Sequence, residues 1–229
     1  MQTTIPTQQR KALIAGATGL IGRALLPMLY NSPHYGEVHV LLRRSVAGLG
    51  KHEKSRVHVV DFAQLPQDLP AVDHAYIALG TTIKVAGSQA AFRQVDLDFV
   101  VNTARAARAG GATRLAVVSA MGANAGSRIF YNRVKGEMEA AIATLGFACV
   151  TIAQPSLLLG DRASLGQPVR PGEVWAERLL GPFQRLIPRG VRPIHSYDVA
   201  AALLTATLAG EQGVHILSSG AMQHADRAG

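Results

Sequence analysis

The stretch Lys11-Ala-Leu-Ile-Ala-Gly-Ala-Thr-Gly-Leu-Ile-Gly22, near the start of a chain of 229 residues, organises the rest of the sequence. Residues 12–15 form a short apolar run, which is typical of a buried strand. From Leu20 to Tyr30 the apolar residues instead recur at helical spacing, which predicts a helix. The stretch therefore predicts a strand, a turn and a helix in direct succession.

Three glycines, Gly16, Gly19 and Gly22, lie where this strand ends and this helix begins, in the order G-x-x-G-x-x-G. In a dinucleotide-binding turn, the first glycine allows the tight turn, the second lets the backbone approach a pyrophosphate, and the third lets the helix pack on the sheet. The free N–H groups and the dipole at the helix start favour bound phosphate. Glycine also serves in ordinary turns, but a triplet that ends a strand and begins a helix is the context that supports dinucleotide binding.

Strands and helices alternate through the first two thirds of the chain. The predicted strands cover 12–15, 38–42, 57–60, part of 71–79, 115–118 and 147–152, and the predicted helices cover 20–30, 88–109 and 131–145. This alternation predicts an α/β fold with a doubly wound, mostly parallel sheet, because right-handed crossovers place helices on both faces. Such sheets bind ligands beyond the carboxyl ends of their strands.

The last third is less regular. Residues 160–192 are rich in Pro, Gly and Arg, with one short helix expected around 173–180. A strand at 191–195, a helix at 197–208 capped by Ser196 and a final strand at 214–217 are expected to follow. We expect one dinucleotide-binding domain over 1–229, in which 160–229 form a small irregular substrate-side region. Within it, 160–192 are expected to cap the substrate pocket, and 223–229 to fray.

The composition narrows the range of partners and locations. Lys and Arg number 23 against 15 Asp and Glu, a net charge of +8, but the basic residues are scattered with few aromatics among them. A general basic surface or a small anionic ligand therefore explains the charge better than a nucleic-acid groove. No apolar run reaches the ~18–20 residues of a membrane span, and no apolar signal region stands at the N-terminus. We expect no nucleic-acid or membrane partner, no metal, and a cytoplasmic protein. The single cysteine, Cys149, is interpreted as a core residue.

Two positions bear on the adenosine end of a dinucleotide. Arg43 and Arg44 follow the second predicted strand, where an acid would bind the 2′-hydroxyl of NAD and an arginine the 2′-phosphate of NADP. Arg43 and Arg44 therefore favour NADP(H) as the cofactor. The alternative is that they are ordinary surface arginines with no role in binding. Asp61 ends the third strand, and is either an acceptor for the adenine amino group or a loop aspartate.

Tyr131 and Lys135 lie four residues apart, so they share one face of a predicted helix. A free tyrosine has a pKa of ~10, and a nearby ammonium favours the phenolate. Such a pair can give a proton to a carbonyl oxygen or remove one from an alcohol. Ser119 ends the fifth predicted strand, where its hydroxyl is expected to orient the reacting oxygen.

These residues resemble the short-chain dehydrogenase/reductase superfamily, and more closely its atypical branch that contains the Tat-interacting-protein oxidoreductases. The similar segments are Leu79-Gly-Thr-Thr-Ile-Lys-Val-Ala-Gly-Ser88, Phe92-Arg-Gln-Val-Asp96, Ser119-Ala-Met-Gly-Ala123, Tyr131-Asn-Arg-Val-Lys-Gly-Glu137, Gln154-Pro-Ser156 and Arg170-Pro-Gly-Glu173. The match runs from about residue 11 to residue 208.

The resemblance implies an NADP(H)-binding Rossmann fold, catalytic roles for Ser119, Tyr131 and Lys135, and a hydrogen bond from Lys135 to the nicotinamide ribose. The predicted cofactor-binding residues are Gly16, Thr18, Gly19, Leu20, Ile21, Gly22, Arg43, Arg44, Asp61, Phe62, Leu79, Gly80, Thr81, Tyr131, Lys135, Pro155, Ser156 and Leu157. Two residues depart from the pattern. Gln154 stands where many relatives carry arginine, and Asp96 stands where extended reductases carry asparagine.

The first hypothesis is an NADPH-dependent reductase of a small carbonyl compound, as a monomer or homodimer. Tyr131 would act as the general acid, Ser119 would orient the carbonyl, and Lys135 would assist the phenol. The second hypothesis is an NADP(H)-binding, redox-responsive regulator without efficient turnover. A nucleotide-sugar epimerase or dehydratase is less favoured, because only about 75 residues follow the sixth predicted strand.

Overall fold

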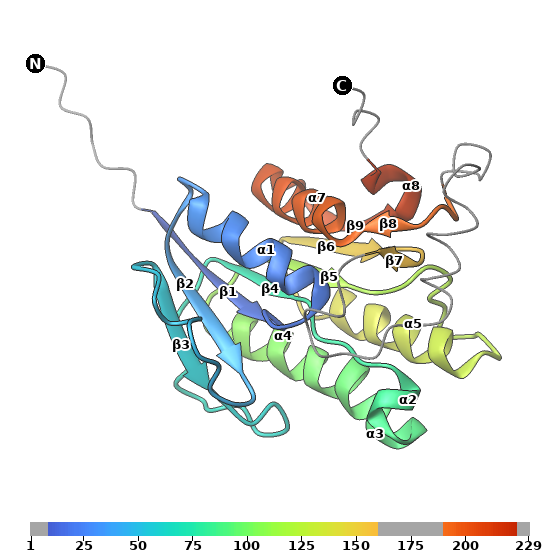
Figure 1. The fold of residues 1–229 in the computed structure, drawn as a ribbon. Coiled ribbons are helices and arrows are strands. Elements are labelled where there is room, and N and C mark those ends of the chain that lie inside the picture. The colour runs from blue at the N-terminus through green and yellow to red at the C-terminus, as the bar shows by residue number, and fades with distance from the viewer. Residues whose placement is uncertain (1–8, 160–189, 224–229) are drawn as a thin grey trace, which may run out of the picture.

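Figure 1 shows a computed structural model of the chain, in which residues 9–159 and 190–223 are described. These residues form a parallel sheet in the order β3-β2-β1-β4-β5-β6-β9. Its strands are β1 (Arg10–Ala15), β2 (Tyr35–Leu42), β3 (Ser55–Val59), β4 (His74–Ile77), β5 (Arg114–Val118), β6 (Cys149–Gln154) and β9 (Gly213–Ser218). The sheet grows in opposite directions from β1, which confirms the predicted doubly wound fold. The turn after β1 therefore lies at the switch point where such sheets bind ligands.

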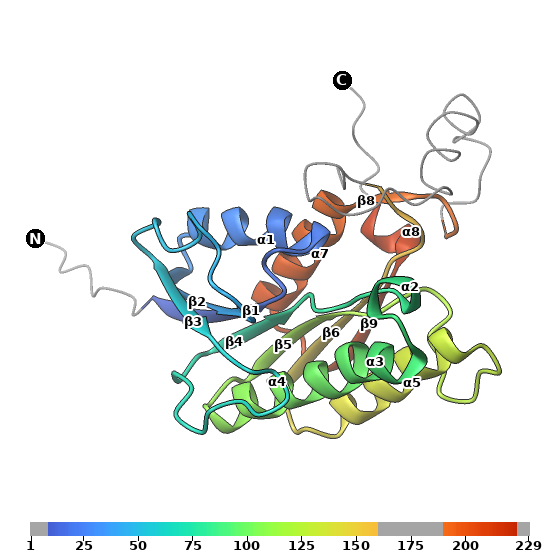
Figure 2. The same cartoon turned by 60° about the horizontal axis from the view of Figure 1, so that its bottom comes forward.

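Helices cover both faces of the sheet. The helices α1 (Leu20–Asn31) and α7 (Ser196–Ala209) lie on one face, and α4 (Val100–Ala109) and α5 (Phe130–Ala143) lie on the other (Figures 1 and 2). In β1, Leu13 packs toward the side of α4 and α5, whereas Ile14 packs toward α1 and α7. The central strands are apolar on both faces because helices cover both.

The long helix predicted over 88–109 is divided into three parts. The segment α3 (Gln89–Arg93) runs into a π-helical segment, η1 (Gln94–Phe99), which continues as α4. A π-turn accommodates an extra residue and changes which side chains face inward. In η1 this places Asp96 in the interior, where it is 1% exposed. Helical periodicity in the sequence does not reveal such a turn.

Several short elements were not predicted or differ in detail. The unpredicted ones are α2 (Ile83–Ala86), β7 (Leu158–Leu159) and α8 (Ser219–Met222). The short strand expected at 191–195 is β8 (Ile194–His195), which pairs with β7 rather than with the main sheet. Ser196 is the first residue of α7, and its side chain makes no capping bond, so the expected serine cap is wrong. The helix expected around 173–180 lies outside the described residues, as does most of the segment expected to cap the pocket.

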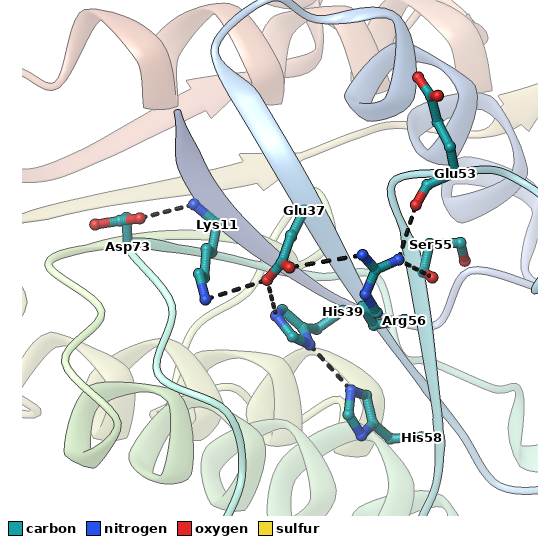
Figure 3. Close-up of polar contacts among 8 residues, drawn as sticks. All are labelled: Lys11, Glu37, His39, Glu53, Ser55, Arg56, His58 and Asp73. Atoms are coloured by element: carbon teal, nitrogen blue, oxygen red, sulfur yellow. Dashed lines mark hydrogen bonds and ion pairs between the residues drawn. The ribbon is translucent and has the colours of Figure 1, made fainter. Parts of the chain in front are cut away.

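The edge strand β3 is joined to β2 by a chain of polar contacts (Figure 3). Glu37 lies 3.1 Å from Lys11 Nζ, 3.6 Å from Arg56 and 3.5 Å from His39 Nε2, and His39 Nδ1 lies 3.0 Å from His58 Nε2. His39 Nε2 is buried and makes no hydrogen bond to the carboxylate, and which ring donates in the His39–His58 contact depends on the tautomers of the two histidines. Burial, and then the neighbouring His58, lower the pKa of His39; burial also lowers the pKa of His58.

A second polar network is buried near the amino ends of the central strands. The hydroxyl of Tyr35 lies 2.7 Å from His74 Nδ1 and 2.6 Å from the hydroxyl of Tyr76. Burial, and then the charge of Arg114, lower the pKa of His74 to about 4, while burial raises the pKa of Tyr35 to about 12. Arg114 also donates to the carbonyls of residues 207 and 208 at the end of α7, each at 2.9 Å. This end of the sheet is a structural core, opposite the end that carries the glycine turn.

Candidate functional site

The glycine turn after β1 has no room for side chains at two of its three glycines. Gly16 has a φ of +90°, and a Cβ there would lie 2.4 Å from the Ala78 carbonyl oxygen. A Cβ on Gly22 would lie 2.0 Å from the Gly16 carbonyl oxygen. At Gly19 the nearest atom to such a Cβ is 3.4 Å away, again the Gly16 oxygen. Gly16 and Gly22 thus hold α1 close to the sheet, as expected, and Gly19 leaves the backbone accessible.

The start of α1 offers backbone N–H groups to an anion. Gly19 is the N-cap, its position provides no side-chain capping bond, and the first turn contains no acidic residue. The first N–H groups of a helix have no partner within it. Thr18 is exposed, Leu20 is half-buried and Ile21 is buried. An uncapped helix start behind a glycine turn fits the pyrophosphate of a dinucleotide.

The segment after β4 connects this turn to α5. Gly16 contacts Ala78, and the next residues are Leu79, Gly80 and Thr81. A Cβ on Gly80 would lie 3.3 Å from Asp96 Oδ1 and 4.0 Å from Lys135 Nζ. The predicted cofactor-lining loop and the predicted catalytic lysine are therefore neighbours in the structure.

Lys135 forms a buried ion pair that sequence reasoning did not predict. Its Nζ lies 2.7 Å from Asp96 Oδ1, and the two side chains are 4% and 1% exposed. The other oxygen, Asp96 Oδ2, accepts a hydrogen bond of 2.8 Å from the backbone N–H of Thr81. Asp96 thus binds the predicted cofactor-lining loop and Lys135 at the same time.

Tyr131 lies one helical turn before Lys135, at the start of α5. Its ring is half-buried and packs 5.3 Å, centroid to centroid, from the ring of Phe92. Within residues 9–159 and 190–223 its hydroxyl makes no hydrogen bond. The predicted Tyr131–Lys135 pair thus shares one helix face in the structure.

Ser119 is engaged elsewhere. It is 4% exposed, and its hydroxyl donates a hydrogen bond to Glu139 on α5. The carboxylate of Glu139 also accepts hydrogen bonds from Gln154 Nε2 at 3.0 and 3.1 Å. Glu139 is eight residues beyond Tyr131, which is about 12 Å along a helix. The structure therefore directs the Ser119 hydroxyl toward Glu139 and not toward Tyr131.

Glu139 is a residue that sequence reasoning missed. It lies four residues after Lys135 and eight after Tyr131, so helical spacing alone places all three on one face of α5. Glu139 could therefore have been found from the sequence, as a carboxylate at helical spacing on the same face as Tyr131 and Lys135.

The residues after β6 connect to the C-terminal part of the chain. Pro155 is buried, and Ser156 Oγ donates to the Arg192 carbonyl at 2.5 Å and lies 2.8 Å from Ser219 Oγ. The carbonyl of Leu157 accepts a hydrogen bond of 2.9 Å from the backbone of residue 194. Two of the three predicted cofactor contacts, Ser156 and Leu157, therefore bind the C-terminal part of the chain, whereas the Pro155 carbonyl accepts a hydrogen bond from Met121.

The predicted adenosine contacts follow β2 and β3. Arg43 and Arg44 are both exposed just beyond β2. Asp61 is exposed, but its Oδ1 accepts a hydrogen bond of 2.9 Å from the backbone of Ala63, which closes its own turn. Phe62 is 4% exposed and belongs to the core. The two arginines are thus open to a phosphate, whereas Phe62 is explained by packing.

Comparisons with known proteins agree with this geometry. A family described as NAD(P)H-binding matches residues 16–175. Protein HTATIP2 of Rattus norvegicus is 34% identical over 178 residues, which cover 76% of this chain and 72% of that protein. Protein FMP52, mitochondrial, of Eremothecium gossypii is 35% identical over 155 residues, covering 66% of this chain and 67% of that protein.

Solved structures share the fold at low sequence identity. The Bordetella bronchiseptica enzyme WbmG, in complex with NAD, has a TM-score of 0.67 at 18% identity, covering 95% of this chain and 75% of that one. MoeE5, in complex with UDP-glucose and NAD, has a TM-score of 0.66 at 17% identity, covering 90% and 75%. Across the part of the chain that the structure describes, no helix is long and apolar enough to cross a membrane.

Proposed function

Because the chain belongs to the NAD(P)H-binding family and is a relative of HTATIP2, we propose that it is an NADPH-dependent oxidoreductase that reduces a small carbonyl compound. The observation that carries this proposal is the pairing on α5. Tyr131 has a phenol without a hydrogen bond to the described residues, and Lys135 is buried one turn further along, beside Gly80 of the loop after β4. These contacts support a role for Tyr131 as proton donor at the edge of the sheet where the glycine turn would hold a cofactor.

The residues that would hold the cofactor are distributed along this edge. The N–H groups at the start of α1 would bind the pyrophosphate, and Lys135 would donate to the nicotinamide ribose. Leu79 to Thr81 and Pro155 to Leu157 would line the cofactor, and Arg43 and Arg44 would bind the 2′-phosphate that distinguishes NADP(H).

In the proposed reaction the cofactor would supply the hydride and Tyr131 would supply the proton. A reduced nicotinamide, when bound, supplies a hydride to the carbonyl carbon. Tyr131 donates its phenolic proton to the carbonyl oxygen, so that an alcohol forms and the phenol becomes a phenolate, which solvent reprotonates. Lys135 holds positive charge near the phenol while this happens. For Ser119 to orient the carbonyl, its hydroxyl would have to turn away from Glu139, since it has one proton to donate.

A redox-responsive regulator that binds NADP(H) without efficient turnover is the second candidate. One contact favours it: the Ser119 hydroxyl is bound to Glu139. A serine hydroxyl has one proton to donate, so in this arrangement it is not available to orient a carbonyl.

Substitution of Tyr131 separates the two candidates. Tyr131→Phe removes one oxygen and keeps the ring that packs on Phe92, so NADPH affinity should be preserved. If the phenol donates the proton, single-turnover reduction of an aldehyde, ketone or quinone panel should fall by about 10²–10⁴-fold. Unchanged turnover would refute the reductase chemistry. Tight NADPH binding by the wild type without reduction of any panel member would favour the regulator.

Location and assembly are part of the same proposal. We propose that the protein is located in the cytoplasm and that it is a monomer or a homodimer. Because the FMP52 relatives are named as mitochondrial, the mitochondrion is the alternative location. Subcellular fractionation and light scattering of the purified protein test both points.

A further inference from the structure

Asp96 occupies the position that connects the cofactor-lining loop to α5. Its carboxylate is 1% exposed. One oxygen contacts Lys135 Nζ at 2.7 Å, and the other accepts the Thr81 N–H at 2.8 Å. The π-turn of η1 brings this side chain inward. A carboxylate satisfies both contacts because each of its oxygens accepts, whereas an asparagine amide has only one accepting oxygen.

Lys135 has no other carboxylate in direct contact among the residues that the structure describes. On α5 itself, Tyr131 lies one turn before it and Glu139 one turn after it. Glu139 is bound to Ser119 and Gln154. On the neighbouring surface, Arg93 of α3 is paired with Glu137. The charge that acts most directly on Lys135 is therefore that of Asp96.

We propose that Asp96 is a positioning residue that offsets the charge of Lys135, so that Tyr131 stays in its protonated, proton-donating form and the site favours carbonyl reduction over alcohol oxidation. This inference rests on the proposed function of Tyr131 and Lys135. An ammonium stabilises a neighbouring phenolate, and a carboxylate 2.7 Å from that ammonium opposes the effect. The acid form of the phenol is the form that reduction requires.

A substrate-free measurement tests the proposal. The protein is prepared with ¹³C-labelled tyrosine, the Tyr131 signal is assigned by its loss in Tyr131→Phe, and the signal is followed by NMR as the pH is raised. In Asp96→Asn the phenol should ionise about one pH unit or more below the wild type, the scale for a nearby charge. Asp98→Asn is the matched control, because Asp98 lies on the same π-helical segment but is exposed; it should leave the titration unchanged.

Two outcomes overturn the proposal: an unchanged Tyr131 titration in Asp96→Asn, or an equal shift in Asp98→Asn, which would indicate a general charge effect. If Asp96→Asn does not fold, Asp96→Ser removes the same charge in a smaller volume and carries the same expectation. The titration needs no turnover, so it succeeds or fails independently of the reductase proposal. Where a carbonyl is reduced, the pH optimum of the reverse oxidation should move down with the phenol titration in Asp96→Asn and stay in place in Asp98→Asn.

Discussion

The hydroxyl of Ser119 donates a hydrogen bond to Glu139, two helical turns beyond Tyr131 on α5. Gln154 binds the same carboxylate from the end of β6. Three side chains thus join the carboxyl ends of β5 and β6 to one helix. In this arrangement the role of Ser119 is structural, because its hydrogen bond joins the end of β5 to α5.

We therefore expect Ser119→Ala to lower stability more than catalysis. Loss of a hydrogen bond to a charged group should reduce the free energy of unfolding by about 1.5–3 kcal/mol, measured by urea denaturation. The rate of carbonyl reduction per folded molecule should fall by much less than the ~10²-fold that is expected when a proton donor is lost. Gln154→Ala is the matched variant, since it removes the other donor to Glu139. A large loss of turnover in Ser119→Ala at unchanged stability would instead support the carbonyl-orienting role.

The two arginines after β2 should determine cofactor preference. Charge-assisted contacts to a 2′-phosphate are worth roughly 1.5–3 kcal/mol together, so NADPH should bind about 10–100-fold more tightly than NADH. Arg43→Ala and Arg44→Ala together should remove this difference, as measured by fluorescence titration of both cofactors. Arg105→Ala, at an exposed position of α4, is the control. A preference for NADH, or one for NADPH that survives both substitutions, contradicts the assignment.

The contact between Gly22 and Gly16 should tolerate no side chain. A Cβ on Gly22 would meet backbone at 2.0 Å, and overpacking of this kind destabilises by about 1–3 kcal/mol or more. Because α1 must move to relieve the contact, Gly22→Ala should also weaken NADPH binding. Gly50→Ala is the control, since its Cβ would make only an ordinary contact at 3.7 Å. Isothermal titration and thermal unfolding of both variants check this; equal behaviour would argue against the close packing.

Stability should fall as the pH drops below about 6.5, the ordinary histidine value. The pKa of His74 is lowered to about 4, and those of His39 and His58 are lowered as well. Below pH 6.5 the unfolded chain therefore binds protons that the folded protein does not, and stability is lost progressively down to about pH 4 for His74. For His74 the loss amounts to roughly 3 kcal/mol.

The pH effect is tested by urea unfolding between pH 4 and pH 8. His74→Asn keeps a polar atom near Tyr35 but does not titrate, so its stability should depend less on pH than that of the wild type. His195→Asn, at an exposed position whose charge is not among those that lower the pKa of His74, should retain the wild-type dependence. An identical pH dependence in His74→Asn and in the wild type would show that His74 is not responsible.

The sequence was most informative where structure depends on neighbours along the chain. The strand before Gly16, the helix after Gly19 and the Tyr131–Lys135 spacing are local patterns, and the structure contains each of them. Arg43 and Arg44 follow their strand as expected; whether they bind a phosphate stays a prediction.

The contacts of the site could not be predicted because they depend on packing between distant segments. Asp96 was noted as unusual, but its pairing with Lys135 requires the π-turn of η1, which periodicity does not signal. Ser119 was expected to face a substrate, yet the position of α5 on the sheet brings Glu139 to it. In both cases the partner in the structure, Lys135 or Glu139, is one that the sequence pattern does not predict.

The packing of α7 on α1 has a consequence for the order in which the protein can fold during synthesis. Leu25 and Leu29 of α1 share a core with Val199 and Leu203 of α7, and β9 pairs with β6. One face of the sheet therefore lacks part of its cover until residues 196–218 have left the ribosome. Up to that moment the nascent chain exposes an apolar surface of the kind that promotes aggregation and engages chaperones. Slow translation of the last quarter of the message should thus lengthen chaperone dependence, whereas slow translation of the first quarter should not.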